Sequence, residues 1–288
     1  MQNDDNDNLP FSQRNGYAEI PPQLKIGEVS DEFRRLLDLV ILSVVDNNRY
    51  TRGSDRFNNG FDGFYKDFHV RFLEEIIITY EGSVADFKSH CHLLIWSEGI
   101  PRLFDFIEFF IKYFTKHKLY TESFKKDLCN VFIDARAAYR IVDDKIMAIG
   151  TEEQGKAVES ALDNTKKYGA KGARSHLISS GTELRNGNWA DSIRESIHAV
   201  ESVAVLLDEK EKTLSGALKK IGKNGNLHGG LKNAFQMLYG YTSDEEGVRH
   251  ALVYQDTPKV DETDALFMLG ACASFVSYLL AKNSQNTT

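Results

Sequence analysis

The sequence predicts an all-α protein with one small β-hairpin, in which a helical N-terminal domain is followed by a helical bundle. Over most of the 288 residues, apolar side chains recur at intervals of three and four, which is the spacing of one helix face. Residues 139–149 alternate instead between apolar and polar, as a strand does. A hydrophobic share of 42% and a charged share of 27% are typical of a soluble globular chain.

Five helices are predicted in the first half, and all of them bury the same side. Ser30 can cap the first helix, because its hydroxyl can accept a free backbone N–H at the helix start. A loop rich in Gly and Asn, residues 58–63, precedes the second helix. The apolar positions of the five helices span residues 33–45, 70–77, 84–96, 103–114 and 121–137.

The alternating segment, YRIVDDKIMAI, is predicted to form a hairpin with Asp143 and Asp144 in its turn. Directly after it, Thr151 and Gln154 have the spacing of a capping box, in which each side chain bonds the other residue's free backbone N–H. This pair predicts a helix that runs to about Asn164.

The best candidate for a domain boundary is the segment KKYGAKGARSH, which begins at Lys166 and is rich in Gly and Lys. We therefore expect a helical N-terminal domain over residues 9–165 and a helical bundle over residues 173–283.

A long helix beginning at Trp189 is predicted to carry two stripes. Its apolar residues step by four and three as far as Leu207. Beside them, Arg194, His198 and Glu201 form a polar stripe at the same spacing.

Residues 241–280 combine a short helix, a loop and a long apolar helix that we expect to be core. Ser243 and Glu246 have the spacing of a second capping box and predict that the short helix begins between them. Arg249 and His250 are neighbours on this helix, so their directions differ by about 100°. Both side chains can still contact one large anion lying across the helix.

Composition excludes several classes of protein. No window approaches the ~20 consecutive apolar residues of a membrane span, and the acidic start MQNDDNDN does not resemble a secretory signal. The three cysteines lie far apart in apolar contexts and do not predict disulfides, so we expect a cytoplasmic protein with no membrane partner. A net charge of −7 argues against a surface that grips nucleic acid everywhere, although a local basic groove is compatible with it.

Several segments together resemble a known family. The C-terminal segments DSIRESIHAVESV, TLSGALKKI, LKNAFQMLYGYTSDEEGVRHAL and DALFMLGACASFVSYLL resemble the abortive-infection AbiJ-related proteins of bacteria and the HEPN helical-domain superfamily to which they are assigned. The segment AYRIVDDKIMAIGTEEQGKAVESAL is similar to the helical N-terminal domain of one group of those proteins. The resemblance implies a bacterial antiphage or stress role and a HEPN-like C-terminal bundle. It also implies RNA as a substrate, a homodimer, and a phage-derived trigger or protein partner.

The candidate site follows from this resemblance, because active relatives are metal-independent endoribonucleases with an Arg followed after four to six residues by a His. Here Arg249 and His250 are adjacent, and the secondary candidates Arg194 and His198 are separated by three residues, so neither pair has that spacing. A histidine can take the proton of an RNA 2′-hydroxyl, and an arginine can stabilise the phosphate charge. Glu201 completes the site by holding Arg249 or orienting His250.

Two other interpretations of these residues stay open at this point. The same side chains can form a polar network that fixes the terminal helix, or they can bind RNA without cleaving it. The alternative function, from a different class, is a non-catalytic helical interaction module that dimerises or docks a partner.

No cofactor and no metal ion are expected. His90, Cys91 and His92 lie on a predicted helix, where only residues three or four apart share a face. The glycine-rich segment KNGNLHGG lacks the G-x-x-x-x-G-K-[ST] spacing of a phosphate-binding loop.

Overall fold

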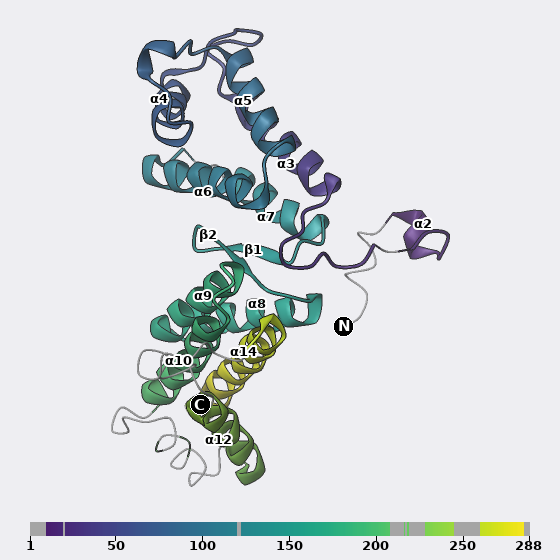
Figure 1. The fold of residues 1–288 in the computed structure, drawn as a ribbon, viewed down its shortest axis with the longest axis vertical. Coiled ribbons are helices and arrows are strands. Elements are labelled where there is room, and N and C mark those ends of the chain that lie inside the picture. Colours follow the sequence, from purple (N-terminus) through teal and green to yellow (C-terminus); the bar gives the residue numbers. More distant parts are fainter. Residues whose placement is uncertain are drawn as a thin grey trace.

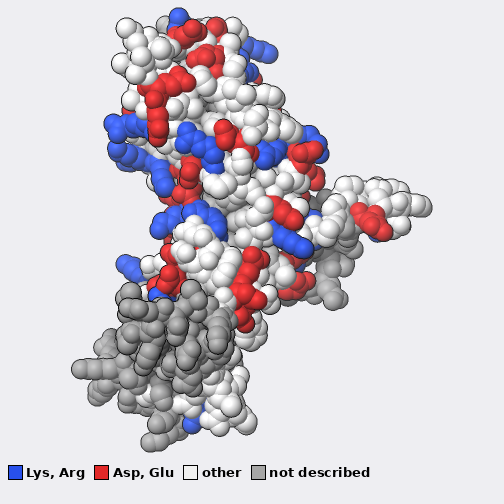
Figure 2. Space-filling model, in the orientation of Figure 1, with Lys and Arg blue, Asp and Glu red and all other residues white. Residues whose placement is uncertain are grey.

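The hairpin lies between two groups of helices in the computed structural model, with the N-terminal group above it and the C-terminal group below it in Figure 1. Every named element of the described residues is a helix apart from the hairpin strands, which confirms the all-α prediction with one small hairpin. Acidic and basic side chains intersperse over the N-terminal group in Figure 2. The structure describes residues 10–19, 21–119, 122–207, 216, 218, 228–244 and 260–284.

Three helices of the N-terminal group, α3, α4 and α5, begin at a side-chain cap. The Ser30 hydroxyl accepts the backbone N–H of Phe33 at 3.1 Å, as predicted, and helix α3 begins at the next residue after Ser30. Helix α3 packs against α5 and α7, while α6 packs against α5 and η1. The elements are α2 (Phe11–Arg14), α3 (Asp31–Asn47), α4 (Asn59–Asp67), η1 (Phe68–Phe72), η2 (Ile77–Thr79), α5 (Val84–Trp96), α6 (Ile100–His117) and α7 (Glu122–Asp134).

The predicted position of the second helix is wrong. Helix α4 begins inside the segment expected to be a loop, because the Asn58 side chain accepts the backbone N–H of Phe61 at 3.0 Å and caps the helix there. The π-helical turn η1 follows α4, and Glu74 next adopts a left-handed backbone with φ of 60°. Ile76 and Ile77, expected in the buried face, are therefore 67% and 58% exposed.

Aromatic side chains fill the core of the N-terminal group. Phe64 is fully buried at its centre, and its ring lies 4.6 Å from that of Phe110 and 5.2 Å from that of Phe114, measured between centroids. Edge-to-face and tilted pairs of this kind stabilise a core beyond the area that they bury. The other rings within contact range of Phe64 are Phe61, Phe68, Phe87, Phe109 and Tyr113.

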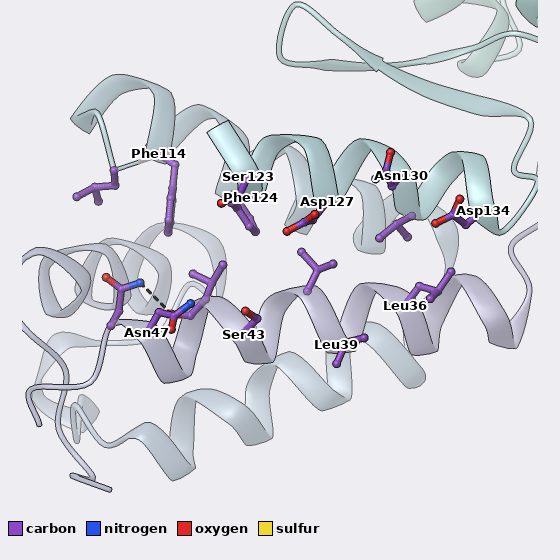
Figure 3. Close-up of a pocket in the computed structure, with 15 residues that line it drawn as sticks. Leu36, Leu39, Ser43, Asn47, Phe114, Ser123, Phe124, Asp127, Asn130 and Asp134 are labelled. Atoms are coloured by element: carbon purple, nitrogen blue, oxygen red, sulfur yellow. Dashed lines mark hydrogen bonds between the residues drawn. The ribbon is translucent and has the colours of Figure 1, made fainter. Parts of the chain in front are cut away.

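A groove of about 430 Å³ lies between α3 and α7 (Figure 3). Leu36 and Leu39 of α3 give it one apolar side, and the exposed carboxylates of Asp127 and Asp134 lie along α7. The sequence did not predict this groove, because its two walls come from helices that are far apart along the chain.

The hairpin is confirmed where it was predicted. Strands β1 (Tyr139–Val142) and β2 (Lys145–Ala148) pair antiparallel, with Tyr139 opposite Ala148 and Val142 opposite Lys145. The turn residues Asp143 and Asp144 both have positive φ, 46° and 64°, as a two-residue turn of this hand requires.

The C-terminal group is a bundle in which α9 and α10 form an antiparallel pair and α14 packs along α8 and α10. The capping box at the start of α8 is confirmed, since the Thr151 hydroxyl accepts the Gln154 N–H and the Gln154 side chain accepts the Thr151 N–H. The predicted domain boundary falls at the turn between α8 and α9, and it stays a prediction. The elements are α8 (Glu152–Lys167), α9 (Lys171–Arg185), α10 (Trp189–Leu207), α12 (Gly229–Asp244) and α14 (Glu262–Ser284).

Helix α14 is the core helix of this bundle. Within the described residues it is the one helix long and apolar enough, over Glu262–Lys282, to cross a membrane by composition, and half of that window is buried inside the protein. Leu269, Val276 and Leu279 are fully or almost fully buried. Its apolar character therefore matches its position against α8 and α10.

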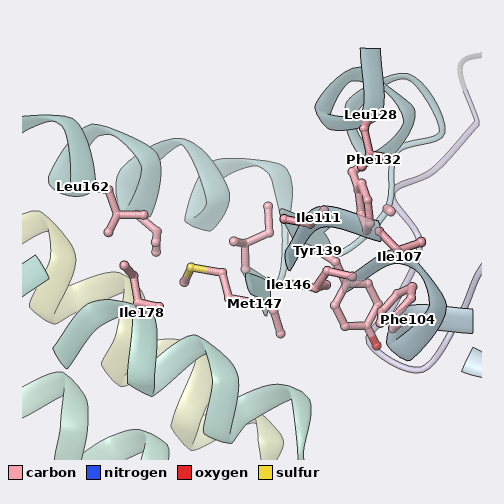
Figure 4. Close-up of a cluster of buried hydrophobic side chains, with 14 of the residues drawn as sticks. Phe104, Ile107, Ile111, Leu128, Phe132, Tyr139, Ile146, Met147, Leu162 and Ile178 are labelled. Atoms are coloured by element: carbon pink, nitrogen blue, oxygen red, sulfur yellow. The ribbon is translucent and has the colours of Figure 1, made fainter. Parts of the chain in front are cut away.

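One continuous hydrophobic core joins the two groups through the hairpin (Figure 4). Tyr139 and Ile146 of the hairpin contact the side of the core formed by Phe104, and Met147 extends toward Ile178 of α9. The hairpin thus acts as the packing layer between the two helical groups.

A polar junction reinforces this layer. The carboxylate of Glu108, on α6, accepts a hydrogen bond from the Ile146 amide at 3.1 Å and another from the Arg185 guanidinium, on α9, at 2.7 Å. Burial opposes ionisation of Glu108, but the hydrogen bonds from Lys112, Arg185 and the Ile146 amide outweigh burial and lower its pKa. One carboxylate therefore ties α6, the hairpin and α9 together.

A second ion pair ties the hairpin turn to α9 and makes stability depend on pH. Both carboxylate oxygens of Asp143 accept hydrogen bonds from Arg174 at 2.7 Å, which lowers the pKa of Asp143. A lowered folded-state pKa contributes stability above the unfolded pKa of about 3.9, and this contribution disappears as pH falls through the folded pKa.

We expect Asp143→Asn to lower the urea midpoint at neutral pH, and the difference from wild type to shrink below about pH 4. An unchanged difference at acid pH would contradict the assignment.

Candidate functional site

The leading candidates lie outside the part of the chain that the structure describes. Arg249 and His250 both fall in the gap between residues 244 and 260. Ser243, predicted to begin a new helix, lies in the last turn of α12, because the helix that begins at Gly229 continues to Asp244. Its predicted capping partner, Glu246, is outside the described residues.

Helix α10 carries the candidates that can be placed. The periodicity predicted its buried apolar stripe, in which Ile193 and Ala204 are fully buried, and the stripe packs against α9 and α14. On the polar stripe, Arg194, His198 and Glu201 are all half-buried, with side-chain exposures of 29%, 32% and 25%. The side chains of the polar stripe are therefore accessible to solvent, while the buried apolar face of α10 anchors the helix in the bundle.

The polar stripe is joined by two residues that sequence reasoning missed, His176 of α9 and Glu195 of α10. The Nδ1 atom of His176 lies 2.8 Å from Oε2 of Glu195, and Nδ1 of His198 lies 3.9 Å from the other oxygen of that carboxylate. The two imidazole rings are 5.3 Å apart between centroids. We name His176, Glu195, His198 and Glu201 the α9–α10 polar cluster.

Within the α9–α10 polar cluster, Glu201 approaches the far side of His198. Its Oε2 atom lies 3.9 Å from Nε2 of His198, so the imidazole stands between two carboxylates. Arg194, on the same stripe, forms an ion pair with Asp191 one turn earlier. The structure thus brings His198 and Glu201 together, and it places Arg194 in contact with Asp191.

The close approach of α9 and α10 follows from their sequences. Asn186 to Asn188 make a tight connection, in which Gly187 has a φ of 78°. Three small residues then face one another at the helix interface. The hydroxyl of Ser180 bonds the Ser192 carbonyl at 2.9 Å and the Ser196 hydroxyl at 2.7 Å, and all three serines are fully buried.

The sequence contains a local pattern that indicates Glu195 but none that indicates His176. Glu195 and His198 are three residues apart, so they share a face of one helix, and Glu-x-x-His is a known ligand arrangement in helical bundles. His176 had no comparable signal, because it comes from a different helix 19 residues before Glu195.

The two buried cysteines of the described part of the chain are unsuited to nucleophilic chemistry. Burial raises the pKa of the Cys91 thiol, and it raises that of Cys272 to about 12. Both side chains therefore stay protonated and act as small apolar groups. His90 belongs to a polar network of the N-terminal group, where the Tyr65 hydroxyl lies 3.3 Å from its Nδ1 and bonds Asp86.

These features define an all-helical protein in which two helical groups flank a hairpin and a solvent-accessible polar cluster lies on the C-terminal bundle. Residues 9–164 match the family described as AbiJ N-terminal domain 4, and this is more than half of the chain. The chain belongs to this family, which indicates a role in abortive-infection defence. No curated protein and no solved structure matches the chain.

Proposed function

We propose that the C-terminal bundle is the effector part of an abortive-infection protein and acts on RNA as a HEPN-type, metal-independent endoribonuclease. The observation that carries this proposal is the polar stripe of α10, where His198 stands between two carboxylates on a solvent-accessible face. The opposite face of α10 is buried in the bundle. A stripe with this chemistry on a rigid helix can position a substrate.

In this proposal Arg249 and His250 are the reacting pair, and Glu201 orients them. His250 takes the proton of the 2′-hydroxyl while the 2′-oxygen attacks the phosphorus. The bond from phosphorus to the 5′-oxygen breaks, the departing 5′-oxygen takes a proton from water, and the products are a 2′,3′-cyclic phosphate and a 5′-hydroxyl. Arg249 stabilises the charge that develops on the phosphate oxygens. Arg194 and His198 extend the stripe along which the RNA strand would lie.

The proposal includes partners for both parts of the chain. A second copy of the chain would pair with the bundle, as the resemblance to HEPN proteins implies. The family-matched part, residues 9–164, would respond to a phage-derived trigger in the cytoplasm.

Incubation of the purified full chain with labelled cellular RNA, with and without EDTA, tests the activity. We expect cleavage by wild type that survives EDTA, and a loss of at least about 100-fold in His250→Ala, since general acid–base groups contribute this much or more. Glu201→Gln should retain part of the activity. His92→Ala, which removes an exposed histidine on α5, is the matched control and should cleave like wild type.

Two results would contradict the proposal. If wild type folds but does not cleave RNA, the non-catalytic interaction module becomes the better description, and size-exclusion chromatography with light scattering would then test for a dimer. If His250→Ala cleaves at the wild-type rate, the reacting pair is assigned wrongly.

A further inference from the structure

Three side chains of the α9–α10 polar cluster have the arrangement of metal ligands. One ligand atom each from His176, Glu195 and His198 lies within 4.8 Å of the other two. Two imidazoles and one carboxylate are the protein ligands of one common type of catalytic zinc site, which keeps its fourth position open. The three side chains are about one-third exposed, so water can reach that position.

The separations between the ligand groups are close to those that one tetrahedral ion requires. With metal–ligand bonds of about 2.0–2.2 Å, two ligand atoms of a tetrahedral site are roughly 3.3 Å apart. His176 Nδ1 lies 2.8 Å from Oε2 of Glu195, and His198 Nδ1 lies 3.9 Å from Oε1 of the same carboxylate, so the two separations to the carboxylate group fall on either side of this value. Small side-chain rotations would equalise them.

Glu201 gives the site a second layer. When Nδ1 of His198 faces the ion, its Nε2 carries the proton and points toward Glu201, whose oxygen lies 3.9 Å away. A carboxylate that accepts the outer N–H of a metal-bound histidine fixes the ring and strengthens the ligand. At 3.9 Å the two groups are outside hydrogen-bond distance, so Glu201 becomes a positioning residue for the ion once its side chain rotates toward the metal-bound His198.

The two helices that carry the ligands are packed closely beneath the site. His176 lies one turn before Ser180, and Glu195 lies directly before Ser196. The buried Ser180–Ser196 hydrogen bond of 2.7 Å therefore joins the two helices next to the ligands from α9 and α10. A site built on two packed helices needs little rearrangement to bind.

The geometry points to a binding site for a single divalent transition-metal ion of the zinc class, held by His176, Glu195 and His198 and supported by Glu201. Imidazole nitrogens favour zinc and its neighbours over magnesium or calcium, which prefer oxygen ligands. The inference goes beyond the proposed RNA cleavage, which uses no metal, and it does not depend on that activity.

Calorimetric titration of the EDTA-treated full chain with Zn²⁺ tests the site, and Co²⁺ absorption in the visible range reports the coordination geometry. We expect one ion per chain with tetrahedral Co²⁺ absorption. His176→Gln, Glu195→Gln and His198→Gln should each weaken binding by at least about 100-fold, and Glu201→Gln by about 10-fold to 100-fold. His92→Ala should bind like wild type.

Thermal unfolding without metal verifies that the variants fold, which is expected because the substituted side chains are half-exposed. Absence of Zn²⁺ binding in folded wild type would overturn the inference, and so would equal binding by wild type and the three ligand variants. Metal binding without RNA cleavage would leave the site intact and count against the proposed function alone. Cleavage of RNA in EDTA by a chain that binds no metal ion would support the proposed function and overturn the metal site.

Discussion

Replacing Phe64 by alanine is expected to lower the free energy of unfolding by about 3–5 kcal/mol, the range for large-to-small substitutions of buried aromatic residues. The Phe64 side chain is fully buried, and rings from α4, η1, α5 and α6 surround it. Its removal leaves a cavity that these rings can fill only in part. Because a domain is stable by only about 5–15 kcal/mol, this single change should remove a large fraction of the stability.

Urea unfolding followed by circular dichroism measures the effect. The matched control is Phe267→Ala on α14, since Phe267 is 56% exposed; it should change the free energy of unfolding by no more than about 0.5 kcal/mol. Equal effects of the two substitutions would show that the aromatic cluster is not the main source of stability in the N-terminal group.

The substitution Glu108→Ala is expected to lower the free energy of unfolding by about 2–3 kcal/mol. It leaves the Arg185 guanidinium and the Ile146 amide without their shared acceptor at a partly buried junction. Arg185 keeps its 2.8 Å hydrogen bond to the Ile146 carbonyl, but a charged donor that loses its carboxylate at a partly buried site carries an uncompensated desolvation cost. The same change should loosen the attachment of α9 to α6, so hydrogen exchange should increase in the hairpin.

The control for this junction is Asp105→Ala, which removes an exposed carboxylate one turn earlier on α6. It should leave stability nearly unchanged. Arg185→Ala and the Glu108→Ala/Arg185→Ala double variant complete a cycle in which we expect the two changes to be strongly non-additive. Additive effects would mean that the two side chains act independently.

Local chemistry explains which elements were predictable. The Ser30 cap and the Thr151–Gln154 box bond backbone groups within three residues of themselves, and the two aspartates of the hairpin turn adopt the positive φ that this turn needs. These structures therefore followed from the sequence. The second helix was predicted at the wrong position because the apolar period was followed there in place of the local cap. Its apolar period indicated residues 70–77, whereas Asn58 capped a helix that begins earlier and passes into a π-helical turn.

The sequence by itself therefore determined the helical class, the hairpin, several helix starts and the amphipathic character of α10 with its polar stripe. Only the tertiary structure decided that His176 meets Glu195, 19 residues away, and that Glu108 meets Arg185, 77 residues away. Helix periodicity specifies which side chains share a face, but not which faces of two helices come together. That choice follows from the buried contacts between helices, here the close serine interface of α9 and α10 and the hairpin between the two groups.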